Sequence, residues 1–178
     1  MDRRTAGNVV IECVTGDIVR QSDMDAVVNA ANAELRPGGG VAGAIHRAAG
    51  PSLDEACREF APIAPGEAVI TSGYQLPNRF VIHCLGPVYG RDEPSDELLA
   101  ACYRNALRLA EQAEIRGVAF PAISTGAFGF PMQAAARIAI GTVAGEAPDL
   151  HSVRHVRFVL HDPKDQALHA TILRELVK

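Results

Sequence analysis

Short apolar segments rich in β-branched residues alternate with segments of helical periodicity along most of the chain. The apolar segments are bounded by Gly, Pro, Asn or Asp, which is typical of buried strands. Strands that alternate with helices predict a central sheet covered on both faces, and therefore an α/β fold built as a three-layer α/β/α sandwich. The expected strands are 8–16, 25–30, 67–73, 79–86, 117–123 and 155–160, and the expected helices are 40–49, 52–60, one from Ser95 to near Gly117, 131–147 and a last one after Asp162.

Two of the expected helices begin with strong capping signals. Ser95 follows Pro94 and precedes two acidic residues, so we expect Ser95 to be the N-cap of a long helix. Asp162 is followed by Pro163, which suits the first helical position, and is the expected N-cap of the last helix. The expected inward faces are Leu98, Cys102, Ala106, Leu109 and Ala113 in the long helix, and Leu168, Ile172 and Leu176 in the last one.

Size and composition limit the class of protein. A chain of 178 residues, with 48% hydrophobic and 21% charged residues, fits a single folded domain over 1–178. The net charge of −4 argues against general binding to nucleic acid or anionic membranes, although a small anion held by local donors remains possible. No apolar run of membrane-spanning length and no signal peptide is found, so the default expectation is a cytoplasmic monomer.

Cysteine and histidine give no sign of a metal centre or a disulfide framework. Four cysteines lie far apart without a CxxC pair, so we interpret them as small buried hydrophobic residues in a reducing compartment. His151 and His155 have the spacing of a helical pair, but they lie in a turn that runs into a strand. We therefore expect no metal and no cofactor. The four cysteines are Cys13, Cys57, Cys84 and Cys102.

Two glycine-rich loops carry the strongest chemical signal. RPGGGV follows the second expected strand, and ISTGAFGF follows the strand GVAFPA. Glycines let backbone N–H groups approach an oxyanion closely, and the helix after the first loop offers its positive end. Two such loops would form a diphosphate cradle at the carboxyl ends of the strands. Alternatively, the glycines of the first loop serve a tight turn and close helix packing.

The first loop also matches a dinucleotide-binding pattern, GxGxxG, at Gly38, Gly40 and Gly43. The context does not fit that pattern, because about eight residues separate the strand from the first glycine and no acidic residue ends a second strand. A P-loop is excluded because no Lys-Ser/Thr pair follows.

Five motifs in order, NAAN, GGGV, GAIHRAAGP, VIHCLGP and AFPAISTGAFGFP, resemble the macrodomain family, in particular its MacroD-type and related bacterial ADP-ribose-binding members. The resemblance extends from VTGDI to the last helix. It implies a mixed sheet of six or seven strands between helices, with ADP-ribose in a cleft at the strand ends. The implied partners are ADP-ribose, ADP-ribosylated proteins or O-acetyl-ADP-ribose.

The resemblance assigns a role to individual residues. Asp17 would accept the adenine amino group, which suits a carboxylate at a strand end, or it is the cap of a helix. Phe128 would face the distal ribose, or it is an ordinary core residue. His161 would stack on adenine, or it lies free on the surface. The positions implied to contact the ligand are Asp17, Ile18, Asn32, Gly38, Gly39, Gly40, Val41, Ala42, Ser124, Thr125, Gly126, Ala127, Phe128 and His161.

Asn32 is the candidate catalytic residue, because it matches the family position that holds the distal ribose and orients a water. Its amide could instead satisfy the backbone of its own loop, and Asn29 has the more structural appearance. MacroD-type hydrolases usually carry an Asp directly after GGGV, where this chain has Ala42. The resemblance also includes members that lack this Asp and still turn over, with the substrate phosphate positioning the water.

Three functions are therefore compared. The first is hydrolysis of ADP-ribosyl esters, either mono-ADP-ribosylated Glu/Asp or O-acetyl-ADP-ribose, which needs only a positioned water and stabilised charge. The second is a non-catalytic reader of ADP-ribose, which the alanine at position 42 favours. The third, a dehydrogenase-type nucleotide site, depends only on the GxGxxG coincidence.

Overall fold

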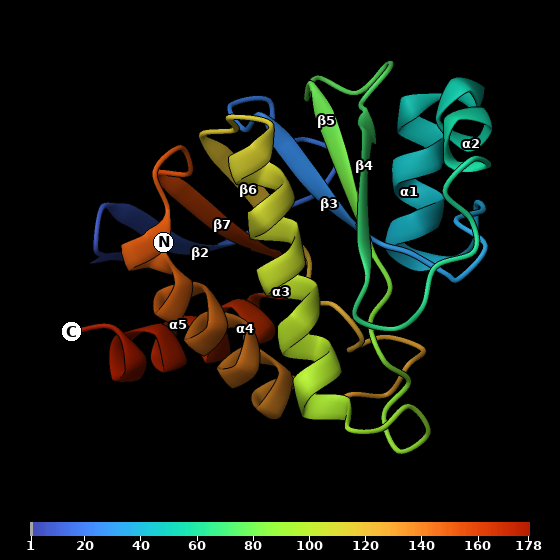
Figure 1. Ribbon diagram of the computed structural model, residues 1–178. Helices are drawn as coiled ribbons and strands as arrows, with labels where there is room; N and C mark the ends of the chain where they lie inside the picture. The colour runs from blue at the N-terminus through green and yellow to red at the C-terminus, as the bar shows by residue number, and fades with distance from the viewer. Residues whose placement is uncertain (1) are drawn as a thin grey trace.

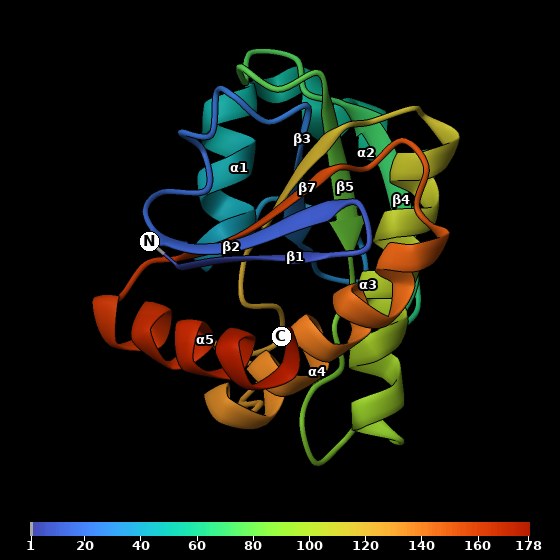
Figure 2. The same ribbon diagram turned by 90° about the vertical axis from the view of Figure 1, so that its left-hand side faces the viewer.

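A seven-stranded mixed sheet lies between two layers of helices in the computed structural model, which describes residues 2–178 (Figures 1 and 2). The predicted α/β/α sandwich is confirmed, with the larger of the two expected strand numbers. In chain order the elements are β1 (Asp2–Ala6), β2 (Val9–Thr15), β3 (Ala26–Ala30), α1 (Gly40–Ala49), α2 (Pro51–Cys57), β4 (Ala68–Ser72), β5 (Phe80–Cys84), α3 (Ser95–Gln112), β6 (Gly117–Phe120), α4 (Met132–Glu146), a 3-10 turn (Ala147–Asp149), β7 (His155–Leu160) and α5 (Pro163–Leu176).

The strand order brings the carboxyl ends of the central strands to one edge. The order is β1-β2-β7-β6-β3-β5-β4, in which β2, β7, β6, β3 and β5 run parallel and the two outer strands are antiparallel to their neighbours. Thr15 pairs with Leu160, and Ala30 pairs with Cys84, so these strands end level with one another. The loops that follow β3, β5 and β6 therefore meet at this edge, where open α/β sheets bind ligands.

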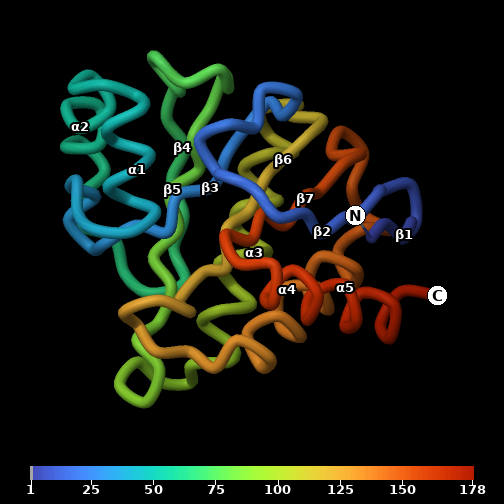
Figure 3. The backbone as a smooth tube through the Cα atoms, turned by 180° about the vertical axis from the view of Figure 1, so that it is seen from behind, coloured from blue at the N-terminus to red at the C-terminus, as the bar shows by residue number. Residues whose placement is uncertain are grey.

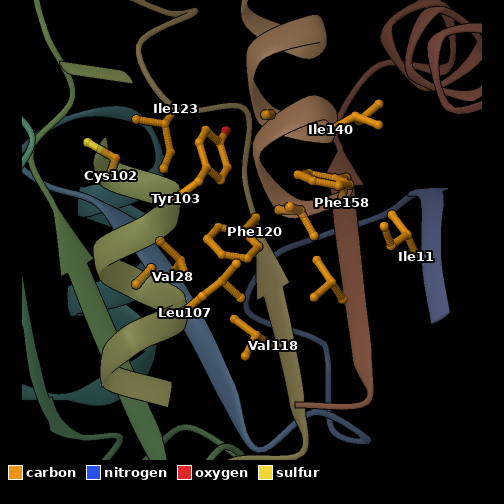
Figure 4. Packing of buried hydrophobic residues seen from close by; sticks show 14 of the residues in the cluster. Ile11, Val28, Cys102, Tyr103, Leu107, Val118, Phe120, Ile123, Ile140 and Phe158 are labelled. Atoms are coloured by element: carbon orange, nitrogen blue, oxygen red, sulfur yellow. The ribbon is translucent and has the colours of Figure 1, made fainter. Parts of the chain in front are cut away.

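Each face of the sheet packs against its own helices. One core contains side chains from α3, α4 and α5 together with Phe120 and Phe158, and the other contains side chains from α1 and α2 together with Val27 and Val81. In the first core the rings of Tyr103 and Phe120 have centroids 5.0 Å apart, and those of Phe120 and Phe158 are 5.9 Å apart (Figure 4). Burial of these large rings fixes α3 against the middle of the sheet.

Several local predictions need correction. The edge strand β1, DRRTA, was not expected, because its polar sequence lacks an apolar alternation. Ser95 is the first residue of α3 and not its N-cap, and its hydroxyl donates to the carbonyl of Asp92. The predicted cap of α5 is confirmed, since Asp162 accepts a hydrogen bond of 2.7 Å from the backbone N–H of Lys164. The expected inward residue Leu176 is 42% exposed.

The buried face of α3 is also turned by one position from the expected one. Cys102 and Ala106 are buried as predicted, whereas Leu98, Leu109 and Ala113 are only partly buried. The buried residues of α3 are Ser95, Leu99, Cys102, Tyr103, Ala106, Leu107 and Ala110.

The four cysteines are free and buried, in agreement with their interpretation as small core residues. Over residues 2–178, no group of three or more His, Cys, Asp or Glu side chains is arranged to hold a metal ion. Within the same residues, no helix has both the length and the apolar character needed to cross a membrane.

Glu111, near the end of α3, fixes the segment that leads into β7. Its carboxylate accepts hydrogen bonds of 2.9–3.1 Å from the backbone N–H groups of His151, Ser152 and Val153. Burial by itself would raise the pKa of Glu111, but these N–H groups and the nearby His151 ring hold it below its ordinary value. The ionised form is therefore the one that stabilises the fold.

We expect Glu111→Gln to lower the free energy of unfolding at neutral pH by about 1–2 kcal/mol, because a charged acceptor is replaced by a neutral one at a partly solvated site. The contribution of Glu111 is present above its unfolded-state pKa and is lost as the pH falls, so the difference from the parent should shrink below about pH 4. Urea unfolding at several pH values measures this. Glu59→Gln is the control, since Glu59 is exposed and has no side-chain hydrogen bond to any of residues 2–178; equal effects of the two substitutions would contradict the assignment.

Candidate functional site

A cavity of about 410 Å³ opens at the carboxyl edge of the sheet, in the size range of small-molecule sites. Its wall comes from the loops after β3, β5 and β6 and from the first turn of α1; Figure 1 shows the loops after β5 and β6 together near the start of α3. No lining side chain is titratable. The lining residues are Ala30, Ala31, Asn32, Gly38, Gly39, Gly40, Val41, Ala42, Gly86, Ala122, Ile123, Ser124, Gly126, Ala127 and Phe128.

The first glycine loop places the N-terminus of α1 at this cavity. Gly39 stands at the N-cap of α1 and offers no capping side chain, and the first turn of α1 holds no acidic residue. The N–H groups of Gly40, Val41 and Ala42 have no hydrogen-bond acceptor within residues 2–178. Unpaired N–H groups at a helix N-terminus attract an anion.

The glycines of the first loop fall into two groups. Gly40 has φ +56°, a conformation that favours glycine, and a Cβ there would meet nothing within 4 Å. A Cβ on Gly43 would lie 2.2 Å from the carbonyl oxygen of Gly38. Gly43 therefore serves close packing of α1 beneath the loop, whereas Gly38, Gly39 and Gly40 border the cavity.

The second glycine loop faces the first across the cavity. Its backbone is closed by hydrogen bonds from the N–H of Phe130 to the carbonyl of Ser124 (2.9 Å) and from the N–H of Gly129 to the carbonyl of Gly126 (3.0 Å). In contrast, the N–H groups of Gly126, Ala127 and Phe128 find no acceptor among the described residues. Three consecutive unpaired N–H groups form a second donor set for an anion.

Ser124 combines backbone strain with an unsatisfied buried hydroxyl. Its φ is +68°, unusual for a residue with a side chain, and its Oγ is buried without a hydrogen-bond partner in the described chain. Gly86 makes room for it, because a Cβ on Gly86 would lie 2.1 Å from Ser124 Oγ. An unsatisfied buried hydroxyl is unusual in a folded protein, and this one belongs to a residue of the cavity wall.

Asn32 lines the cavity while binding its own loop. Its Nδ2 donates to the carbonyl of Arg36 (2.8 Å), and its Oδ1 accepts from the N–H of Arg36 (2.9 Å). The loop-satisfying alternative is therefore present in this structure. The amide still has one N–H and one lone pair free for a further partner. Arg36 is itself fixed to α2 by a hydrogen bond of 2.9 Å from Nε to the carboxylate of Asp54.

Four predicted contact residues lie outside the cavity wall. Asp17 is exposed two residues after β2 and His161 is exposed directly after β7; these strands are adjacent in the sheet, so both residues border the same edge. Ile18 is only 7% exposed and packs in the core beneath α1. Thr125 donates its hydroxyl to the carbonyl of Ala122 (2.7 Å), so its side chain shapes the loop. Phe128, by contrast, is partly exposed and lines the cavity.

Behind the cavity lies a buried polar group that sequence reasoning did not assemble. Asn29 Nδ2 is 3.0 Å from His83 Nδ1, and His83 Nε2 is 3.0 Å from Thr71 Oγ1. Burial, with the nearby His46, lowers the pKa of His83 to about 3. His83 therefore stays neutral, and Asn29 has the structural role expected of it. The contacts join β3, β4 and β5, which no sequence spacing could reveal.

Comparison with known proteins identifies relatives over almost the whole chain. Residues 28–139 match the model of the Macro domain family. A macro domain-containing protein of Chlorobaculum tepidum is 51% identical over 159 residues, covering 89% of this chain and 92% of the relative. One from Ralstonia nicotianae is 48% identical over 168 residues, covering 94% and 96% respectively.

Solved structures agree with this match. The Oceanobacillus iheyensis macrodomain with ADP has a TM-score of 0.93 at 40% identity, covering 98% of this chain and 95% of that one. The Trypanosoma brucei macrodomain in complex with ADP-ribose has a TM-score of 0.81 at 38% identity, covering 90% of this chain and 68% of that one.

Proposed function

Because this chain belongs to the macro domain family, we propose that its cavity binds ADP-ribose and that it hydrolyses ADP-ribosyl esters. The observation that carries the binding proposal is the pair of facing donor sets. One set is at the N-terminus of α1 and the other is in the loop Gly126–Phe128, and both are unpaired within residues 2–178. Between them a diphosphate would receive backbone hydrogen bonds without any Lys or Arg, in keeping with the negative net charge of the chain.

The ends of the ligand follow from the diphosphate position. The adenine would extend along the sheet edge toward Asp17 and His161, which follow β2 and β7. The distal ribose would lie inside the cavity between Asn32 and Phe128, where the amide can bind hydroxyls and the ring can pack on the sugar. Relatives solved with ADP and with ADP-ribose support the ligand class.

Hydrolysis would depend on positioning, because the cavity wall contains no acid or base. Asn32 would orient a water toward the ester, and the substrate's own phosphate would assist. Water and ester would give a free carboxylic acid and the ADP-ribose hydroxyl. The unpaired backbone N–H groups of the two loops are the donors available to stabilise developing negative charge.

Two measurements test the proposal. Titration calorimetry with ADP-ribose should give a saturable one-to-one isotherm, and absence of binding would refute the ligand assignment. Release of ADP-ribose from a glutamate-linked substrate should exceed spontaneous loss. Tight binding without release would instead establish a reader, the function that an alanine at position 42 favours.

Asp17→Ala should weaken ADP-ribose binding about tenfold to a hundredfold, because a charged acceptor for the adenine amino group is lost. The side chain is half exposed, and its Oδ1 accepts only from the N–H of Val19 (3.1 Å), so the fold should persist. Calorimetry gives the affinity. Asp149→Ala, in the 3-10 turn away from the sheet edge, is the control. Unchanged affinity in Asp17→Ala would show that the adenine lies elsewhere.

A further inference from the structure

A fully buried carboxylate anchors an arginine on the neighbouring strand. Glu12 of β2 is 0% exposed and is the register partner of Arg157 on β7. Its Oε1 accepts from Arg157 Nε (2.7 Å) and lies 2.6 Å from His155 Nε2, while its Oε2 accepts from Arg3 (3.0 Å). Removal of one partner from such a buried pair is strongly unfavourable, so the guanidinium has one fixed position.

The remaining donors of Arg157 reach the connection between β2 and β3. Because these strands are parallel, residues 16–25 must return along the sheet, and they do so without a regular helix (Figure 3). Arg157 binds both carboxylate oxygens of Asp23 at 2.8 Å and donates from Nη1 to Oε1 of Gln21 (2.9 Å). These side chains attach the middle of the connection to β7, in addition to the backbone hydrogen bond from the N–H of Gly16 to the carbonyl of Leu160 (2.9 Å) at its start.

Gln21 carries this attachment on to the turn that contains Asp17. Its side chain is buried, and its Nε2 donates to the carbonyl oxygen of Asp17 (2.8 Å). The other contacts of Asp17, from the N–H groups of Val19 and Arg20 and from Arg20 Nε at 3.9 Å, stay within the turn. The residue before it, Gly16, donates from its N–H to the carbonyl of Leu160 at the end of β7 (2.9 Å), so Gln21 supplies the side-chain tie of the turn itself. The chain of contacts runs from Glu12 through Arg157 and Gln21 to Asp17.

We infer that Gln21, held by Arg157, is a positioning residue: it holds Asp17 in the place where its carboxylate can accept a hydrogen bond from the purine amino group. The inference rests on the proposed function, since Asp17 recognises a base only if adenine binds at this edge. Gln21 suits the task because one amide both accepts from the anchored guanidinium and donates to the turn. Glutamate at this position would keep the first bond and lose the second.

The test measures discrimination between ADP and inosine diphosphate, which differ by an amino group and an oxo group and carry the same charge. The parent should bind ADP at least about tenfold more tightly than inosine diphosphate, the value of one hydrogen bond to a charged group. In Gln21→Glu the ratio of the two dissociation constants should fall to about threefold or less, with a melting temperature near that of the parent. Gln21→Ala should lose the discrimination as well.

A matched control and a double mutant separate positioning from general stability. Gln166 makes a comparable bond, from Nε2 to the carbonyl of Cys13 (2.9 Å), but away from the turn. Gln166→Ala should therefore keep the parent ratio. In an Asp17→Ala background, Gln21→Glu should cause no further loss of discrimination, because nothing remains to be positioned.

The outcomes distinguish the two levels of the proposal. A parent that does not discriminate overturns the adenine assignment of the proposed function, and the role of Gln21 falls with it. A discriminating parent whose ratio survives in Gln21→Glu overturns the role of Gln21 alone and leaves the proposed function intact.

Discussion

Gly126→Glu should abolish detectable ADP-ribose binding while the protein remains folded. The site tolerates the substitution sterically, because a Cβ at Gly126 would meet no atom within 4 Å. In the complex, however, the new carboxylate would occupy the space in front of the unpaired N–H groups of the second loop. It would exclude the diphosphate by volume and repel it by like charge, which together lower the affinity by more than about a hundredfold.

A control of equal charge makes this result specific. Gly145 on α4 is also exposed and also has open space at its Cβ position, so Gly145→Glu adds the same charge far from the cavity. It should keep the parent affinity. Circular dichroism and thermal melting establish that both variants fold. If Gly126→Glu still bound ADP-ribose, the phosphates would have to lie elsewhere and the two-loop cradle would be wrong.

The layers of the fold could be predicted because they follow from periodicity. Apolar runs such as those around Val27 in β3 and Val81 in β5 specify buried strands, and helical spacing specifies the helices that cover them. β1 was not predicted because an edge strand buries little apolar surface, and its polar sequence shows no alternation of apolar and polar residues. The capping prediction for Ser95 was wrong because the helix begins one residue earlier than expected: Pro94 stands at the N-cap, and the Ser95 hydroxyl turns back to donate to the carbonyl of Asp92.

In the candidate site, too, some features could be predicted from the sequence and others could not. The two glycine loops could be predicted, because glycine spacing after strands is a sequence property with a direct backbone meaning. The contacts that complete the wall could not be. The fit of Gly86 against Ser124 joins two loops that lie 38 positions apart in the chain, and the attachment of Asp17 through Gln21 depends on a strand more than 130 residues away. The sequence alone does not show which residues of such distant segments come into contact.

Ala42→Asp should raise the rate of ADP-ribosyl ester hydrolysis. Ala42 is the third residue of α1 and lines the cavity, so a carboxylate there would be close to the water that Asn32 is proposed to orient. General-base assistance contributes roughly 10²–10⁴ in rate when the geometry is good. We expect an increase of at least about tenfold in kcat, because the base is introduced without the neighbours that would tune it. Asn32→Ala should lower kcat in both the parent and the Ala42→Asp background.

Two opposing effects accompany the new carboxylate, and kinetics separate them. An acidic side chain in the first turn of α1 is favoured by the helix dipole, but Ala42 is only 5% exposed, so thermal melting must first establish that the variant folds. The same charge near the diphosphate weakens binding of substrate and transition state alike, which raises KM without changing kcat. Single-turnover rates at saturating substrate therefore report the base alone. If the parent is active and the Ala42→Asp variant is no faster in kcat, position 42 does not face the reacting bond. If the parent is inactive and the variant gains turnover, the natural protein is a reader of ADP-ribose, and a single substitution converts it into a hydrolase.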